Sequence, residues 1–203
     1  MQSRLDAARA RQPALTSFPL RHDTGKMAAY IGLDLGTSGC RAVAIDDEGR
    51  TLAGHAVTLP PSQRRDDRAE QDPRDWWSAT IACLQPIATQ LADHSIAAIA
   101  VDGTSGSVLV CNPGGDPLSP GLMYDDARAS QQAARVRHAA PVNTVAASAT
   151  AGLPKLLWLG DHLDFPDPVY ALNQADWIAG RLCGQFASSD YNNALRMGYD
   201  PLR

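Results

Sequence analysis

A polar turn at residues 34–39 is the clearest candidate for chemistry in the sequence. It reads Asp-Leu-Gly-Thr-Ser-Gly and directly follows a short apolar run. Its two glycines let backbone N–H groups approach an anion, and the hydroxyls of Thr37 and Ser38 add donors. Asp34 supplies a hard oxygen ligand of the kind that Mg²⁺ prefers. The turn therefore predicts a phosphate loop beside a metal-binding carboxylate. The expected phosphate contacts are Gly36, Thr37 and Ser38.

This loop lies between two apolar runs rather than before a helix. A strand-like pattern resumes at Cys40, so the loop differs from the Walker pattern and from Gly-x-Gly-x-x-Gly, which both lead into helices. In a loop of this kind we expect Asp34 and Thr37 to be the catalytic contacts. The alternative interpretation is an ordinary hairpin turn without a ligand.

Length and composition limit the classes of protein to consider. The chain has 203 residues, 44% of them hydrophobic, and a formal net charge of −4. This suffices for one sizeable domain or two small ones, and it is too apolar for a disordered chain. The slight acidity argues against a nucleic-acid partner, and no apolar run approaches the ~20 residues that span a bilayer. We therefore expect a globular protein with no nucleic-acid and no membrane partner.

A predicted three-stranded meander positions the loop. Strand patterns cover Tyr30–Leu35, Cys40–Ile45 and Thr51–Leu59. Short turns join these strands, which favours antiparallel pairing because parallel neighbours need a long crossover. Residues 60–71 are polar and predict an exposed loop.

A helix is predicted to begin after Asp72. Asp72 can cap it, Pro73 fits the first helical position, and apolar residues then recur at helical spacing. Pro86 should kink or split this helix. Trp76 and Trp77 are expected in the core rather than in a ligand cage.

The remainder of the chain predicts further strands and helices. Ser95–Asp102 is nearly all apolar, so we expect a strand buried on both faces, with another strand over Ser107–Cys111. Helices are predicted over Arg128–Ala139, Pro154–His162 and Gln174–Leu182, the last ending near Gly184. A meander followed by a helix, strands and helices predicts an α/β domain with a mixed sheet.

Cysteines and histidines predict no metal centre. The four cysteines, at positions 40, 83, 111 and 183, form no Cys-x-x-Cys pair, and the five histidines are scattered. We expect free thiols, mostly in the core, as is usual in a reducing cytosol.

The first 26 residues differ in composition from the rest. They hold five basic and two acidic residues, and they lack the continuous apolar segment of a secretory signal. We expect a basic, disordered extension over 1–26 and a folded domain over 27–203. A transit peptide, or a true start at Met27, are the alternatives.

Seven segments resemble the FGGY carbohydrate kinases, the family of glycerol, xylulose, ribulose and gluconate kinases. They occur in the family's order and cover nearly all of residues 27–203. The resemblance is greatest to pentulose kinases of the D-ribulose and D-xylulose type. The segments are Tyr30–Ser38, Ala69–Pro73 with Trp76 and Trp77, Ile99–Ser107, Asp125–Arg128, Lys155–Leu159, Ala175–Trp177 and Ser189–Ala194.

The resemblance implies an actin-like ATPase domain of the ribonuclease-H-like class, present here as the N-terminal lobe only. Such kinases hold ATP, Mg²⁺ and a sugar in the cleft between two lobes. A small-molecule sugar and a C-terminal kinase lobe are therefore the implied partners, and the general base would fall after Arg203. The resemblance also implies a cytoplasmic enzyme, and it leaves a homodimer open.

The resemblance further implies that a second turn contacts the sugar. Thr104, Ser105 and Gly106 occupy this turn. Glycerol kinases carry an Arg-Glu pair where this sequence has Ser105 and Gly106, so the small residues here disfavour glycerol as the substrate. The alternative is a plain turn between strands.

Two charged residues nearby have two interpretations each. Asp126 lies in a family motif and is a candidate sugar contact, but it could instead cap the following helix and pair with Arg128. Lys155 either reaches the cleft or is solvated at the start of a helix.

Three functions are compatible with these residues. The leading hypothesis is ATP-dependent phosphorylation of a sugar hydroxyl, on a pentulose such as D-ribulose or D-xylulose, with this chain inactive by itself. The alternatives are a non-enzymatic actin-like module that binds a nucleotide or sugar, and a truncated pseudokinase.

Overall fold

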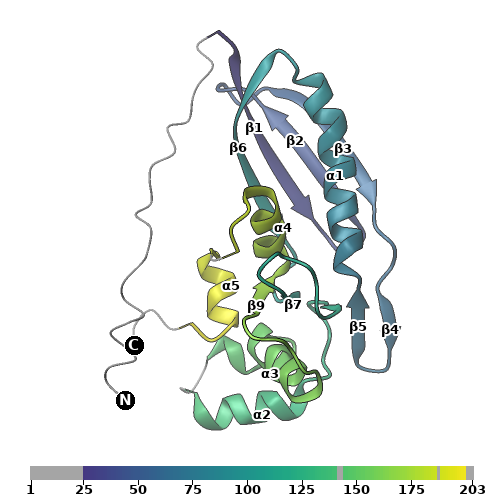
Figure 1. Cartoon of the computed structure of the whole chain (residues 1–203), viewed down its shortest axis with the longest axis vertical. Coiled ribbons are helices and arrows are strands. Elements are labelled where there is room, and N and C mark those ends of the chain that lie inside the picture. The colour runs from purple at the N-terminus through teal and green to yellow at the C-terminus, as the bar shows by residue number, and fades with distance from the viewer. Residues whose placement is uncertain (1–24, 141–143, 187, 200–203) are drawn as a thin grey trace, which may run out of the picture.

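The computed structural model of the chain describes residues 25–140, 144–186 and 188–199. They form a long four-stranded sheet covered on one face by helix α1, and a smaller five-stranded sheet with the remaining helices around it (Figure 1). The expected basic extension lies almost entirely outside the described residues. Within them, every helix is too short or too polar to cross a membrane.

The four-stranded sheet begins with the predicted meander. Strands β1 (Met27–Leu35), β2 (Gly39–Ile45) and β3 (Thr51–Thr58) pair antiparallel, and β6 (His94–Gly103) pairs parallel with β1. The sheet order is β3-β2-β1-β6, so the predicted mixed sheet is confirmed. Side chains alternate along β1 and β2, with one face buried and the other exposed.

Helix α1 (Pro73–Gln90) packs on the buried face of this sheet, against β2 and β3. Asp72 caps it as predicted, because its carboxylate accepts from the amide of Arg74 at 2.9 Å. Pro86 lies inside the helix without splitting it, so that part of the prediction is wrong. Proline has no N–H, so the helix lacks one backbone hydrogen bond at Pro86. Burial of Cys83 and Ile87 against the sheet stabilises the helix despite this loss.

The sequence predicts an exposed loop over residues 60–71, but the structure has two strands in this segment. They contain a hairpin of β4 (Gln63–Arg65) and β5 (Arg68–Gln71), and β5 pairs with β8 (Gly121–Leu122). The side chains of these strands are mostly polar, so the sequence gives no strand pattern there. Pairing of β5 with β8, 50 positions away in the sequence, stabilises the hairpin.

Strand β6 is also not buried on both faces. Ile96 is 44% exposed and Ile99 39% exposed, because β6 is the edge of the sheet among the described strands and α4 covers only part of it. An apolar run predicts a strand, but it does not specify what covers that strand.

The smaller sheet has the order β4-β5-β8-β7-β9, with β7 (Val108–Cys111) in the predicted place and β9 (Tyr170–Asn173) not predicted. The three predicted later helices are confirmed with shifted ends. A short fifth helix was not predicted, because six residues give little periodicity. The helices are α2 (Ser130–Ala139), α3 (Gly152–His162), α4 (Gln174–Cys183) and α5 (Tyr191–Arg196), with a 3₁₀ turn, η3, over Val145–Ala147.

The core contains most of the aromatic and thiol groups that the sequence assigns to it, but Trp77 is only partly buried, packed against the core. Trp76 is fully buried, and its indole N–H donates to Gln71 Oε1 at 2.8 Å. All four cysteines are free thiols; Cys183 is exposed and the other three are buried. Burial raises the pKa of the Cys40 thiol to about 12, which is typical of an unreactive core cysteine.

Candidate active site

The two polar turns lie side by side at one edge of the four-stranded sheet. Strands β1 and β6 are parallel neighbours whose register pairs Asp34 with Asp102 and Leu35 with Gly103. The phosphate loop follows β1, and the candidate sugar turn follows β6. Since the carboxyl ends of parallel strands face the same way, a ligand at this edge can meet both turns.

Three charged side chains lie across the exposed face at this edge. Asp34 is flanked by Asp102 on β6 and by Arg41 on β2, and its carboxylate lies 3.7 Å from the Arg41 guanidinium. The Asp34 side chain is 56% exposed, so it remains accessible to a ligand. These three residues line a hollow of about 410 Å³ over the sheet face.

Hydrogen bonds fix the phosphate loop through its carbonyl groups. The amide of Leu59 donates to Ser38 O at 2.9 Å, and Gln71 Nε2 donates to Thr37 O at 2.9 Å. The amide of Gly36 closes the loop onto Gly39 O at 3.0 Å. Within the part of the chain that the structure describes, no hydrogen bond uses the amides of residues 37 and 38, which leaves them as donors for an anion.

The two loop glycines are needed for different reasons. A Cβ on Gly39 would lie 2.7 Å from Val57 O, so β3 leaves no space for a side chain there. A Cβ on Gly36 would find its nearest neighbour at 3.6 Å, an ordinary contact. Gly39 therefore serves the packing of the hairpin, and Gly36 leaves space at the surface of the loop.

Each residue of the candidate sugar turn is held by a different helix. The amide of Thr104 donates to Gln174 Oε1 of α4 at 2.9 Å. Ser105 Oγ donates to Asn193 Oδ1 of α5 at 3.1 Å. Gly106 adopts the left-handed conformation, with φ of 87°, which favours glycine.

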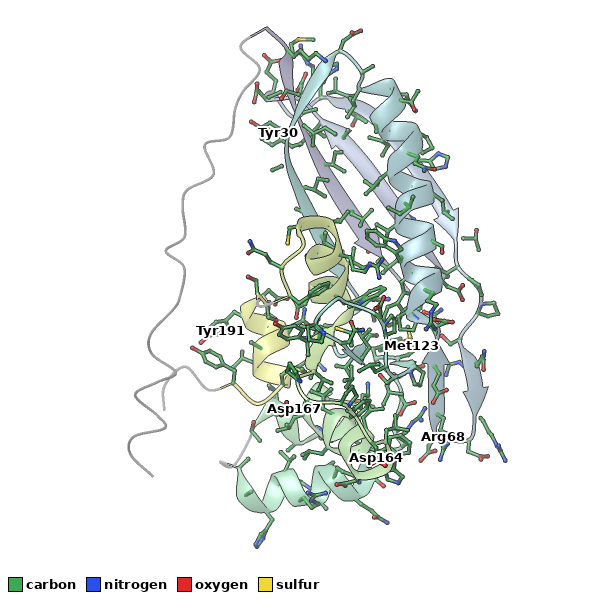
Figure 2. All side chains as sticks on the ribbon, in the orientation of Figure 1. Tyr30, Arg68, Met123, Asp164, Asp167 and Tyr191 are labelled. Atoms are coloured by element: carbon green, nitrogen blue, oxygen red, sulfur yellow. The ribbon has the colours of Figure 1, made fainter. Side chains whose placement is uncertain are left out.

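Lys155 of α3 holds the carbonyl group of this turn from inside the protein. It is fully buried, and its Nζ donates to Gly106 O at 2.9 Å and to Met123 O at 2.5 Å. Figure 2 places Met123 in the interior, between the long sheet and the lower helices. Burial lowers the Lys155 pKa to about 8. Of its two interpretations, the solvated lysine is therefore wrong.

Asp126 is buried inside the protein and is not among the residues of the hollow at the sheet edge. It is fully buried, accepts from the amide of Ala69 at 2.7 Å, and forms a two-pronged pair with Arg128. Arg128 also pairs with Glu70 at 2.6 Å. Burial lowers the pKa of Arg128, but these hydrogen bonds outweigh burial, so its pKa is raised. The predicted local pairing is confirmed, whereas Asp126 does not cap α2, whose N-cap is Ala129.

Sequence reasoning missed the position of Asp102 and Arg41 beside Asp34. A signal was present, because Gly-Thr-Ser-Gly occurs at 36–39 and again at 103–106, each time one or two residues after an aspartate near the end of a strand. Only the parallel pairing of β1 with β6 brings the two copies together. The described residues contain no cluster of three or more histidine, cysteine, aspartate or glutamate side chains that could hold a metal ion.

Comparison with known proteins agrees with this arrangement. The model of the FGGY family of carbohydrate kinases, N-terminal domain, matches residues 29–201. The xylulose kinase of Escherichia coli K12 is 29% identical over 180 residues, which cover 84% of this chain and 37% of that protein. The glycerol kinase of Delftia acidovorans is 29% identical over 122 residues, which cover 59% of this chain and 24% of that protein.

Solved structures share the fold. The xylulose kinase of Rhodospirillum rubrum aligns with a TM-score of 0.72 at 24% identity, covering 84% of this chain and 37% of that one. The Plasmodium falciparum glycerol kinase with ADP aligns with a TM-score of 0.70 at 16% identity, over the same shares of the two chains. The predicted actin-like ATPase fold is confirmed, and this chain corresponds to the N-terminal part of those kinases.

This chain spans 37% of the length of the Escherichia coli relative, so it represents about a third of such a protein. The family match covers most of the chain, includes both turns at the sheet edge, and agrees with the shared fold. The chain belongs to the FGGY family of carbohydrate kinases and contains that family's N-terminal domain.

Proposed function

We propose that this chain is the N-terminal part of an ATP-dependent kinase that phosphorylates a hydroxyl group of a pentulose. The observation that carries the proposal is the placement of the loop at 36–38 and the turn at 104–106 on adjacent parallel strands. Phosphoryl transfer depends mainly on positioning and on charge stabilisation, so a phosphate loop beside a sugar-binding turn suits it.

The phosphate loop would bind the terminal phosphates of ATP. Thr37 and Ser38 offer free amides and hydroxyls at an accessible edge, and Gly36 beside them leaves space because it has no side chain. Asp34 and Asp102 fit a Mg²⁺ ion, because magnesium is commonly bound by one or two carboxylates together with substrate phosphates. When bound, the ion would neutralise developing phosphate charge.

The turn at 104–106 would bind the sugar. Its small side chains leave space for a pentulose, and the relatives with which the chain aligns over most of its length include xylulose kinases. Asp126 is buried in its pair with Arg128, so we assign it to the support of this region rather than to direct sugar contact.

The chain would be inactive by itself, and a C-terminal lobe would complete the cleft. Because Asp34 and Asp102, the two carboxylates paired at this edge, are assigned to the Mg²⁺ ion, we assign the proton acceptor to that second lobe. The 203-residue chain is expected to transfer no phosphate from ATP to D-xylulose or D-ribulose in a coupled assay. Turnover comparable with that of a complete kinase would contradict the proposal.

Binding to the chain tests the site directly. In ¹H–¹⁵N spectra, a Mg²⁺ complex of a non-hydrolysable ATP analogue should shift the amides of residues 36–38, and a pentulose should shift those of 104–106. Asp34→Asn should remove the Mg²⁺-dependent part of the first response. Asp93→Asn is the matched control, because it makes the same charge change in the segment before β6, away from this edge.

Two results would contradict the proposal. One is the absence of shifts at both turns with either ligand. The other is nucleotide-dependent assembly of the chain without sugar binding, which would favour the non-enzymatic actin-like module.

A further inference from the structure

We propose that Lys155, Gln174 and Asn193 are positioning residues that fix the sugar turn Thr104–Gly106 from three helices. The inference rests on the proposed function, since it assigns a role to the turn that would bind the sugar. Each of the three residues lies near the N-terminus of its helix: Lys155 in α3, Gln174 in α4 and Asn193 in α5.

Gln174 holds the start of the turn. Its side chain is fully buried, and its Oε1 accepts the Thr104 amide at 2.9 Å. Its backbone amide also donates to Ser107 O at 3.0 Å, so this one residue bonds to both ends of the turn. Its Nε2 is buried without a partner among the described residues.

Asn193 orients the side chain at the centre of the turn. It is 6% exposed, and its Oδ1 accepts from Ser105 Oγ at 3.1 Å. Its own orientation is fixed by Asp190, which accepts from both the Asn193 backbone amide at 3.0 Å and its side-chain amide. The Ser105 hydroxyl is therefore held by a chain of hydrogen bonds that begins at the cap of α5.

Lys155 holds the end of the turn. Its Nζ bridges Gly106 O and Met123 O, so it connects the turn to Met123, which directly follows β8. The Asp126–Arg128 pair lies close by, because the amide of Asp126 donates to Met123 O at 3.0 Å. The buried pair thus supports the turn through Met123 and Lys155.

These contacts from other elements fix the conformation of the turn, because the turn has few hydrogen bonds of its own. Within the turn, only the Ser107 amide closes back, onto Thr104 O at 3.1 Å. The other anchors come from residues 49 to 88 positions away in the sequence. Because a 1 Å displacement of a substrate-positioning group can cost about 10²-fold in rate, anchors of this kind would affect sugar binding without touching the sugar.

Hydrogen exchange of the Thr104 amide tests the inference in the intact 203-residue chain. Gln174→Met removes the acceptor with little change in volume, so exchange at Thr104 and Ser107 should accelerate about tenfold, while core amides of β1 remain protected. D-xylulose affinity, measured by calorimetry, should fall about fivefold to tenfold, the value of one hydrogen bond. Gln174→Glu keeps an acceptor oxygen and removes no hydrogen bond, so it should restore protection at Thr104.

Gln132→Met is the matched control, because Gln132 is also buried but bonds to Asp161 on α3 rather than to the turn. It should leave Thr104 exchange unchanged. Asn193→Ala gives a second, independent variant, which should shift the amides of Ser105 and Gly106 and weaken sugar binding. Unchanged Thr104 exchange in Gln174→Met, together with unchanged turn amides in Asn193→Ala, would overturn the inference.

The same experiment separates this inference from the proposed function. If the wild-type chain binds no pentulose, the proposed function is contradicted for this chain, whereas the exchange data still decide whether the three residues fix the turn. If the wild type binds a pentulose and the variants change exchange without changing affinity, the positioning role toward the sugar is refuted.

Discussion

At the residue scale, Lys155 is the group whose environment departs furthest from that of a surface residue. A fully buried ammonium costs free energy, and Lys155 offsets part of it with two backbone carbonyls and the nearby carboxylates of Asp125 and Asp126. Arg128 and Arg196 oppose this charge. Its pKa of about 8 expresses the balance, with burial as the largest contribution.

This pKa predicts that stability increases with pH over a defined range. The unfolded chain keeps Lys155 charged up to about pH 10.4, whereas the folded chain loses the proton near pH 8. Between these values the unfolded state binds more protons, so the free energy of unfolding rises with pH, by up to about 3 kcal/mol from this residue. Urea unfolding of the wild type and of Lys155→Met at pH 7 and pH 10 measures this pH-dependent contribution to the free energy of unfolding.

The comparison with Lys155→Met cancels the titration of all other groups. The wild type should gain about 2–3 kcal/mol relative to the variant between the two pH values. A constant difference would show that Lys155 titrates at its ordinary pKa. If the variant does not fold, an NMR titration of the Lys155 side chain gives the same answer in the wild type.

At the element scale, the hairpin of β1 and β2 shows how strand packing determines loop composition. The loop between these strands is bonded on one side to Leu59, just beyond β3, and on the other to Gln71 of β5. Gly39 lies against β3, and Gly36 lies at the accessible surface. Two glycines that look equivalent in the sequence therefore have different roles.

Alanine substitutions should separate these two roles. Gly39→Ala places a methyl group 2.7 Å from Val57 O, so the backbone must move, and the free energy of unfolding should fall by about 1–3 kcal/mol. Gly36→Ala meets only an ordinary contact, so its effect on stability should stay within about 0.5 kcal/mol.

For nucleotide binding we expect the reverse order, with a larger loss in Gly36→Ala than in Gly39→Ala. The methyl group of Gly36→Ala would occupy space at the surface of the proposed phosphate loop, so this variant should weaken binding of the Mg²⁺–nucleotide complex. Equal losses of stability in the two variants, measured by urea unfolding, would refute the distinction between packing and ligand space.

At the scale of the whole molecule, the two sheets share one main core. A single buried cluster contains Leu33 and Leu35 of the long sheet and Leu109 and Leu172 of the smaller one, with Trp76 and Trp177 between them. The two indole rings lie 6.3 Å apart in an edge-to-face arrangement. Separate unfolding of either sheet would expose this shared surface.

The shared core predicts one cooperative unfolding transition. Tryptophan fluorescence and far-ultraviolet circular dichroism should give coincident urea midpoints, because both sheets contribute to the same main buried cluster. Leu159→Ala, in the smaller cluster beside β7, should shift both midpoints equally and cost about 2–5 kcal/mol. Separate midpoints for the two probes would show that the sheets unfold independently.

The exposed face of the long sheet is also a property of the whole molecule. Tyr30, Val43 and Ile45 lie there, 36–44% exposed, and Figure 2 shows Tyr30 pointing away from α1. The site hollow lies on this same face, next to the charged residues at the sheet edge. The open face thus continues from the apolar strand centres to Asp34 and Asp102.

The sequence by itself determined the local structure and the family. Alternation identified the meander, Asp72 and Pro73 identified the start of α1, and the polar loop at 34–39 identified the candidate phosphate site. These features depend on residues that are near neighbours in the chain, so periodicity and turn chemistry report them directly.

Only the tertiary structure decided which of these pieces meet. The parallel pairing of β1 with β6 places Asp102 beside Asp34, and three helices place Gln174, Asn193 and Lys155 around the turn. It also buried Asp126 and Lys155, which both look like surface residues in the sequence. Contacts between distant residues depend on the packing of whole elements, and no local pattern encodes that packing.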